Sequence, residues 1–263
     1  MTSSLFDTHC HLDVSEFSHD WRDELSLAQA RGVSALLVPA VSRAGWQHLS
    51  AVVASDVSLH AAYGLHPCYL AEHDRVADAD ALGHWLEATP AVAVGECGLD
   101  FFIQDTDPAA QEALLMSQLS VARSLSLPVI LHARRSHDQL LLCLRRAGVM
   151  RGIVHAWSGS EEQARRFVDA GFLLGFGGAA TFERALKLRR LLKSLPLESV
   201  VLETDAPDIP PAFARGERNT PAHLPRIAAL LAEVRGIPPD ELALATTRNA
   251  ARLFGLSIPA GAV

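Results

Sequence analysis

The segment Asp7-Thr8-His9-Cys10-His11-Leu12 offers two imidazoles that are separated by one residue. Side chains alternate between the two faces of a β-strand, so a strand here would point His9 and His11 the same way and Cys10 the opposite way. Two imidazoles on one face supply half of the ligands of a transition-metal site. The motif therefore predicts a metal site to which Cys10 contributes nothing.

Further candidate ligands follow apolar runs that are typical of buried strands. They are Glu96, His132, His155 and Asp205. Four histidines and two carboxylates are more than one ion needs, so we expect two divalent ions, with Mg²⁺, Mn²⁺ and Zn²⁺ as the candidates. Glu96 is expected to bridge them, because its strand lies between the two histidine sets. Two ions about 3.5–4 Å apart would activate a shared water for hydrolysis.

Short apolar runs alternate with longer amphipathic ones along the whole chain. The pattern predicts eight strands and at least six helices. The strands are expected at 6–11, 35–39, 59–65, 92–96, 129–132, 152–155, 172–176 and 200–205. The helices are expected at 20–31, 109–125, 161–170, 182–195, 221–235 and 247–254.

Eight strands alternating with helices in 263 residues predict an α/β fold, a (β/α)₈ TIM barrel that uses residues 1–263 as a single domain. The rival is a doubly wound open sheet, which would place a glycine-rich loop after its first strand. This chain has His-Cys-His-Leu-Asp there instead. In a barrel the carboxyl ends of all strands meet on one face, so we expect the six candidate ligands to converge at one mouth.

The amino-acid composition is that of a globular protein and not of a membrane-spanning one. Hydrophobic residues make up 49% and charged residues 20%, as in soluble globular proteins. Four widely spaced cysteines and no recognisable signal peptide predict a cytoplasmic protein with reduced thiols. No apolar stretch reaches the ~18 residues of a membrane span. The net charge of −7 argues against non-specific coating of duplex DNA, and no cofactor motif supports redox chemistry.

Six motifs occur in a fixed order along nearly the whole chain. They are Asp7-Thr8-His9-Cys10-His11-Leu12, Gly64-Leu65-His66-Pro67, Val94-Gly95-Glu96-Cys97-Gly98-Leu99-Asp100, Pro128-Val129-Ile130-Leu131-His132-Ala133-Arg134, Val154-His155-Ala156-Trp157-Ser158-Gly159 and Leu202-Glu203-Thr204-Asp205-Ala206-Pro207. In these motifs the sequence resembles the TatD family of metal-dependent deoxyribonucleases and related hydrolases. The resemblance implies a TIM barrel, a site for one or two metal ions and phosphodiester hydrolysis, with DNA exonuclease activity in some members.

The resemblance also implies roles for the ligands. The His-x-His pair matches the ligands of the first ion, Glu96 the bridging carboxylate, and His132 and His155 the ligands of the second ion. Asp205 matches the aspartate of the last strand, which is placed to accept a proton from the attacking water. Glu96 and Asp205 are therefore the expected catalytic groups.

Four other residues are candidates for contacts around the metal site. Arg134 follows His132 by two positions, and its guanidinium suits a phosphate oxygen. His66 either contacts substrate or holds its loop. Glu203 and Asp7 share strand faces with predicted ligands, so each either orients a ligand histidine or forms a structural ion pair.

Several positions leave the substrate open. The chain departs from many family members at Arg218-Asn219-Thr220-Pro221, where an acidic residue often precedes the proline, and at Trp157 and Phe101-Phe102. Three glycines at the end of the seventh strand, at 175, 177 and 178, either let backbone approach the substrate or form a simple turn. The remaining histidines are expected at the surface: His19, His48, His60, His73, His84, His137 and His223.

Three functions fit these residues. The first is a phosphodiesterase or deoxyribonuclease of the 3'-5' exonuclease type, acting on DNA, expected to be single-stranded, or on a small phosphoester. The second is a metal-dependent amidase, esterase or lactonase, which the net charge of −7 and the 6% of aromatic residues favour. The third, a binding barrel without activity, is disfavoured by the full ligand set. We expect a monomer that does not bind membranes.

Overall fold

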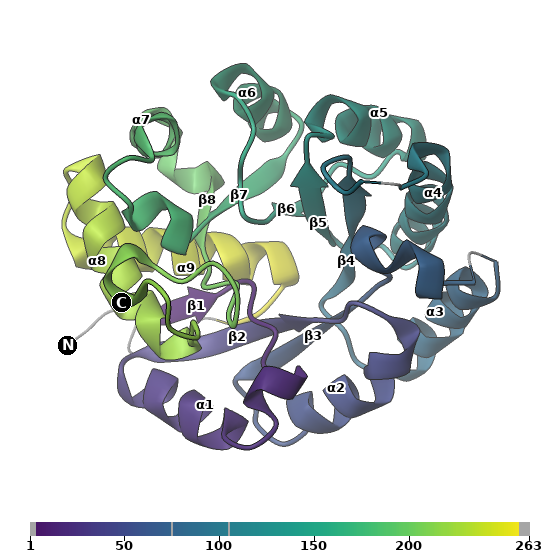
Figure 1. The fold of residues 1–263 in the computed structure, drawn as a ribbon, viewed down its shortest axis with the longest axis horizontal. Coiled ribbons are helices and arrows are strands. Elements are labelled where there is room, and N and C mark those ends of the chain that lie inside the picture. Colours follow the sequence, from purple (N-terminus) through teal and green to yellow (C-terminus); the bar gives the residue numbers. More distant parts are fainter. Residues whose placement is uncertain (1–3, 75, 105, 258–263) are drawn as a thin grey trace. The chain divides into compact units, whose positions relative to one another are not determined.

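The computed structural model describes residues 4–74, 76–104 and 106–257. Within these ranges the chain forms one parallel sheet in the order β1 to β8, with helices between the strands, which is the order of a (β/α)₈ barrel (Figure 1). The predicted fold class is confirmed. The strands are β1 Leu5–Asp7, β2 Val33–Pro39, β3 Leu59–Tyr63, β4 Ala93–Asp100, β5 Val129–Arg134, β6 Gly152–Val154, β7 Phe172–Phe176 and β8 Val200–Leu202.

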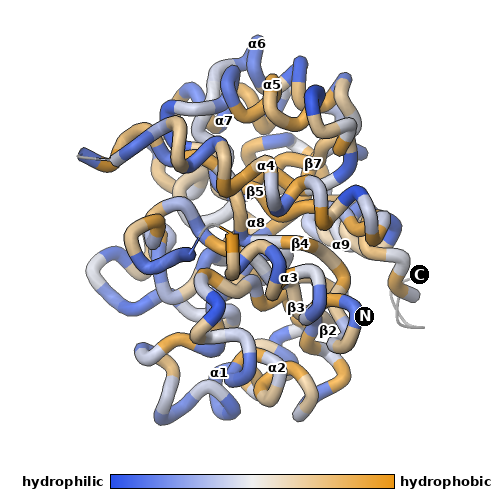
Figure 2. The backbone as a smooth tube through the Cα atoms, turned by 90° about the vertical axis from the view of Figure 1, so that its right-hand side faces the viewer, coloured by the Kyte–Doolittle hydropathy of each residue, from blue (hydrophilic) through white to orange (hydrophobic). Residues whose placement is uncertain are grey.

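In the described ranges, seven helices lie between successive strands and two follow the last strand. They are α1 Trp21–Ala30, α2 Trp46–Val53, α3 Ala77–Ala88, α4 Pro108–Ser124, α5 His137–Ala147, α6 Glu161–Asp169, α7 Leu186–Ser194, α8 Leu224–Arg235 and α9 Pro239–Phe254. In Figure 2 hydrophobic residues gather along the strands, whereas α6 is largely hydrophilic. None of the helices in the described ranges has the length and hydropathy needed to cross a bilayer.

The chain divides into two compact units. The terminal unit consists of Met1–Val38 and Leu173–Val263, and the central unit consists of Pro39–Phe172. The single domain over residues 1–263 stays a prediction.

In the central unit, β3 pairs with β4, β4 with β5, and β5 with β6, all in parallel. Every residue of β4 is buried, and α4 packs against this strand. Gly98 lies opposite His132 in the ladder, and a Cβ at Gly98 would fall 2.1 Å from the carbonyl oxygen of His132. Only glycine therefore lets β4 approach β5 at the position of a predicted metal ligand.

In the terminal unit, β1 pairs with β2 and β7 with β8. The segments that follow β1 and β8 are joined by a parallel bridge between Cys10 and Ala206 and by the hydrogen bond from the Thr8 N–H to the Leu202 carbonyl oxygen, 3.0 Å long. Helix α9 packs on both strands and on α8 (Figure 1). The terminal unit thus places the segment after β1 against the segment after β8.

The carboxyl ends of three strands differ from the prediction by three or four residues. Strand β1 ends at Asp7 and β8 at Leu202, so the predicted ligands that follow them lie in irregular segments. The N–H groups there bond singly to facing carbonyls, as when the His11 N–H donates to Ala206, and make no regular ladder. Strand β4 continues to Asp100, because its pairing with β5 resumes at Cys97, so Glu96 lies within the strand and not at its end.

Helix boundaries also differ. Helix α9 begins at Pro239 and not at 247, and α7 begins at Leu186, after a separate 3₁₀ turn at Gly178–Thr181. Pro239 occupies the first turn of α9, where the missing N–H of proline costs no helix hydrogen bond. Helices α2, α3 and α5 lie outside the predicted helix ranges.

Candidate metal centre

In the terminal unit, the predicted ligands His9, His11 and Asp205 lie together. The two Nε2 atoms are 3.2 Å apart. Oδ1 of Asp205 lies 3.6 Å from Nε2 of His9 and 3.8 Å from Nε2 of His11. Ligand atoms about 2.1 Å from one ion lie roughly 3.0–3.4 Å apart, so these three atoms are close to the spacing that a single ion requires.

A network of buried hydrogen bonds holds this group. The Asp7 carboxylate accepts from the Thr204 N–H at 2.9 Å and from the Thr204 hydroxyl at 2.6 Å. The Asp205 N–H donates to the His9 carbonyl oxygen at 2.8 Å. Burial raises the pKa of Asp7 to about 7, against the lowering effect of these bonds. Asp7 therefore joins the segment that carries His9 to the segment that carries Asp205.

In the central unit, three imidazoles converge on one carboxylate oxygen. Oε1 of Glu96 lies 2.7 Å from Nε2 of His155, 3.0 Å from Nε2 of His66 and 3.1 Å from Nδ1 of His132. Glu96 is only 1% exposed. The structure thus brings Glu96, His132 and His155 together as the sequence predicts, and it adds His66 to the group.

His132 is oriented by a residue that the sequence analysis gave no role. Its Nε2 lies 2.9 Å from Oδ2 of Asp100. A hydrogen on Nε2 donates to this carboxylate, which turns the lone pair of Nδ1 toward Glu96 and His155. Burial opposes protonation of His132, but the hydrogen bonds to Asp100 and Glu96 outweigh it and raise its pKa to about 9. A cation that binds Nδ1 must therefore displace a proton from this nitrogen.

Asp100 could have been found from strand periodicity. It follows Glu96 by four positions on the same strand, and residues two and four apart share one face. Its other oxygen accepts from the N–H groups of Phe102 at 2.8 Å and Ile103 at 3.2 Å. Burial would raise the pKa of Asp100, but the bonds from His132 and Phe102 bring it down to about 2.

His66 holds the Glu96 carboxylate by a hydrogen bond. Nδ1 of His66 accepts from the Cys68 N–H at 3.1 Å, so in the neutral ring the hydrogen lies on Nε2 and is donated to Glu96. This bond fixes the direction of the carboxylate. The predicted contact between His66 and substrate stays a prediction.

The donor atoms suit a divalent cation. Nδ1 of His132 lies 3.3 Å from Nε2 of His155, and the two Nε2 atoms of His9 and His11 face each other in the same way. Two neutral ring nitrogens can share at most one hydrogen, whereas a cation accepts both lone pairs. Imidazole and carboxylate ligands suit Zn²⁺ and Mn²⁺. The bridging role of Glu96 and the convergence of all six ligands stay predictions.

Three other expectations can be compared with the structure. Glu203 is 1% exposed, and a Cβ at Gly175 would fall 2.1 Å from its Oε2, so the glycine provides room for Glu203. Arg218 binds Asp20 at 2.6 Å and Glu24 at 3.0 Å, which holds the guanidinium against α1. His137 is 5% exposed, so its prediction as a surface residue was wrong, because its ring packs edge to face on Trp157.

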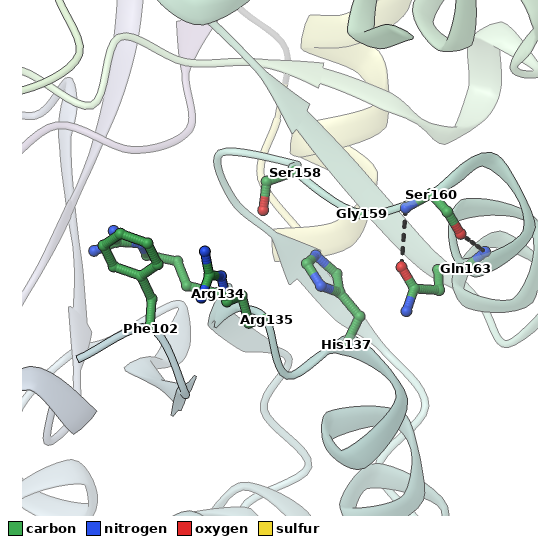
Figure 3. A pocket seen from close by; sticks show the side chains of 8 residues that line it. All are labelled: Phe102, Arg134, Arg135, His137, Ser158, Gly159, Ser160 and Gln163. Atoms are coloured by element: carbon green, nitrogen blue, oxygen red, sulfur yellow. Dashed lines mark hydrogen bonds between the residues drawn. The ribbon is translucent and has the colours of Figure 1, made fainter. Parts of the chain in front are cut away.

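Arg134 ends β5 at the edge of a cavity (Figure 3). One of its nitrogens, Nη1, lies 3.4 Å from Oδ2 of Asp100, the same oxygen that His132 contacts. Arg134 is thus linked to a metal-ligand candidate through a shared carboxylate. Its predicted contact with phosphate stays a prediction.

Comparison with known proteins identifies the family of this chain. The family described as TatD related DNase matches residues 6–255. The uncharacterized metal-dependent hydrolase YjjV of Escherichia coli K12 is 43% identical over 259 residues, covering 97% of this chain and 100% of the relative. The 3'-5' ssDNA/RNA exonuclease TatD of Klebsiella pneumoniae is 34% identical over 266 residues, covering 97% of this chain and 99% of that protein.

A solved structure gives the same result. The crystal structure of YjjV from Escherichia coli K12 superposes with a TM-score of 0.93 at 42% identity and covers 98% of this chain and 100% of that chain. The match spans the segments that carry both groups of candidate ligands. This chain is therefore a member of the TatD family of metal-dependent hydrolases.

Proposed function

We propose that this protein is a metal-dependent phosphodiesterase that degrades single-stranded DNA from the 3' end. The observation that carries the proposal is the pairing of His132 with Arg134. The two side chains come from one strand and contact the same oxygen of Asp100. A cation ligand and an exposed guanidinium are therefore fixed side by side, which suits a substrate that carries a phosphate. The relative from Klebsiella pneumoniae supports the choice of nucleic acid.

Each group of candidate residues has its own role in the proposed reaction. His9, His11 and Asp205 would hold one divalent ion, and Glu96, His132 and His155 a second, with Mg²⁺, Mn²⁺ and Zn²⁺ as candidates. When bound, such ions polarise the phosphate and lower the pKa of the attacking water. Asp205 accepts the proton of that water. Asp100 and His66 hold His132 and Glu96 in place, and Arg134 binds a phosphate oxygen of the substrate.

The test uses a single-stranded oligonucleotide labelled at its 5' end and incubated with Mg²⁺ or Mn²⁺. We expect a ladder of labelled products that shorten one nucleotide at a time, and complete loss of cleavage with excess chelator. His155→Ala should lower the rate at least ~100-fold, whereas His84→Ala, on the exposed face of α3, should not change it. Metal-loaded protein that leaves DNA and RNA intact would refute the proposal.

A second candidate keeps the same site but acts on an amide, ester or lactone. The net charge of −7 and the 6% of aromatic residues favour a small substrate over a long polyanion. A panel of phosphodiesters and acyl esters separates the two, because only the phosphodiesterase should cleave bis(p-nitrophenyl) phosphate faster than p-nitrophenyl acetate. We also propose that the chain acts as a monomeric, cytoplasmic, single-domain protein. Size-exclusion chromatography with light scattering tests the oligomeric state.

A further inference from the structure

The central unit contains a cavity of about 390 Å³ beside Arg134. Its walls come from the segment after β4, the end of β5, the start of α5 and the loop before α6 (Figure 3). The lining residues include two arginines and no carboxylate. The volume falls within the range of about 300–1,000 Å³ that small-molecule sites occupy. The cavity is thus large enough for a nucleotide and has the charge to attract an anion.

Phe102 organises the two guanidinium groups. The Cζ atoms of Arg134 and Arg135 lie 4.3 Å and 4.6 Å from the centroid of its ring. Arg135 adopts a left-handed backbone with φ of 55°, a conformation that is uncommon outside glycine and is often found at functional sites. Among the residues that the structure describes, no carboxylate forms an ion pair with Arg135. The charge of this guanidinium therefore remains available to a ligand.

His137 is the second independent feature of the cavity. It is 5% exposed, and within the described ranges its Nε2 has no hydrogen-bond partner. Burial lowers its pKa to about 4, so the ring is neutral at pH 7 and offers a donor and an acceptor. Figure 3 shows the ring pointing from the start of α5 toward the Ser158-Gly159 loop. A buried polar atom without a partner costs free energy, which a hydrogen bond to a ligand in the cavity would offset.

The acidic residues Asp100 and Asp138 near the cavity are both held by internal contacts, and Oδ2 of Asp100 lies 3.4 Å from Nη1 of Arg134 and 2.9 Å from Nε2 of His132. Asp138 lies next to His137 on α5, but its carboxylate binds Nη1 of Arg166 at 2.5 Å and accepts from Nε2 of Gln163 at 2.8 Å. Gln163 also completes the capping box of α6 with Ser160. The wall opposite the arginines is therefore held in place by internal bonds, and its charge does not oppose an anion.

We infer that this cavity binds a second, non-scissile phosphate of the substrate together with its nucleoside. Arg135 contacts this second phosphate, because a guanidinium group pairs with its oxygens in two-pronged hydrogen bonds. His137 contributes a neutral hydrogen-bonding group at the wall. The inference rests on the proposed function, because it takes the ligand of the cavity to be part of the substrate. Binding to the cavity can nevertheless be measured without catalysis.

The binding arm uses isothermal titration of the full-length protein with thymidine 5'-monophosphate in the presence of chelator. We expect binding to wild type and to Arg146→Gln, an exposed α5 control with the same loss of charge, and at least ~10-fold weaker binding to Arg135→Gln. Thymidine should not bind, and inorganic phosphate should bind more weakly than the nucleotide. Equal binding to wild type and Arg135→Gln, or equal binding of phosphate and nucleotide, would overturn the inference.

The kinetic arm compares thymidylyl-thymidine, which has one phosphate, with the trinucleotide that has two. Arg135→Gln should raise KM about 10-fold for the trinucleotide and leave KM within 2-fold for the dinucleotide. His137→Phe keeps the ring against Trp157 and should weaken nucleotide binding about 3-fold. If wild type cleaves neither compound, the proposed function fails, and the titration alone decides about the cavity. Unchanged KM values for an Arg135→Gln protein that cleaves both compounds would refute the inference.

Discussion

Replacing Asp100 by Asn tests the reasoning about the metal centre most directly. In the wild type, Oδ1 of Asp100 accepts from the Phe102 and Ile103 N–H groups, and Oδ2 accepts from Nε2 of His132. An asparagine must turn its only oxygen toward the two N–H groups, so its NH₂ group faces His132. An NH₂ group donates, and therefore the hydrogen of His132 moves from Nε2 to Nδ1. The lone pair that would bind the cation is lost.

The expected size follows from the kind of contact that is removed. Loss of a hydrogen bond that fixes the tautomer of a metal-binding histidine lowers affinity about 10–100-fold, which is ~1.4–2.7 kcal/mol. Competition between the protein and a fluorescent chelator for Zn²⁺ measures it. The matched control is Asp169→Asn, an exposed residue of α6 with the same change in charge, which should leave the affinity unchanged. A folded Asp100→Asn protein that binds Zn²⁺ as tightly as wild type would refute the reasoning.

Three further predictions concern stability. Gly98→Ala should lower the free energy of unfolding, measured by urea denaturation, by ~3 kcal/mol or more, because the added Cβ would fall 2.1 Å from the His132 carbonyl oxygen. The control Gly83→Ala, inside α3, should raise the free energy of unfolding by about 0.5–1 kcal/mol. The pKa of His137 in the folded protein is about 4, below its unfolded value of 6.5. The free energy of unfolding should therefore fall by up to about 3 kcal/mol as the pH falls from 6.5 to 4. His137→Phe should abolish this contribution of His137 to the pH dependence. Removal of metal should lower Tm, and Zn²⁺ at 100 times its Kd should restore ~2.7 kcal/mol of the free energy of unfolding. A Tm that is unchanged by chelator would contradict a bound ion.

The sequence predicted the candidate ligands better than the elements that carry them. Residue type and order were enough to select His9, His132 and Asp205 as candidates, because imidazoles and carboxylates after apolar runs are unusual. Strand ends were not predictable, since β1 and β8 end where their N–H groups turn to single bonds with facing segments. Those bonds depend on residues about 200 positions apart, which no local pattern records.

The features that the sequence analysis missed depend on distances between strands. The role of Asp100 requires β4 to continue beyond Glu96, and this depends on the close approach that Gly98 permits. A glycine in a strand indicates close approach but does not name the partner. His137 was predicted at the surface because no other candidate ligand accompanies it in the sequence, and only its packing on Trp157 shows otherwise.

The hydrogen bonds between Asp7 and Thr204 also bear on protein synthesis. These residues are 197 positions apart, so the N-terminal imidazoles leave the ribosome long before Asp205 exists. At about 5–20 residues per second, translation of the chain between them takes roughly 10–40 s. Glu96, His132 and His155 are separated by far shorter stretches of chain. A nascent chain halted before β8 can therefore carry only the central group of ligands in native form.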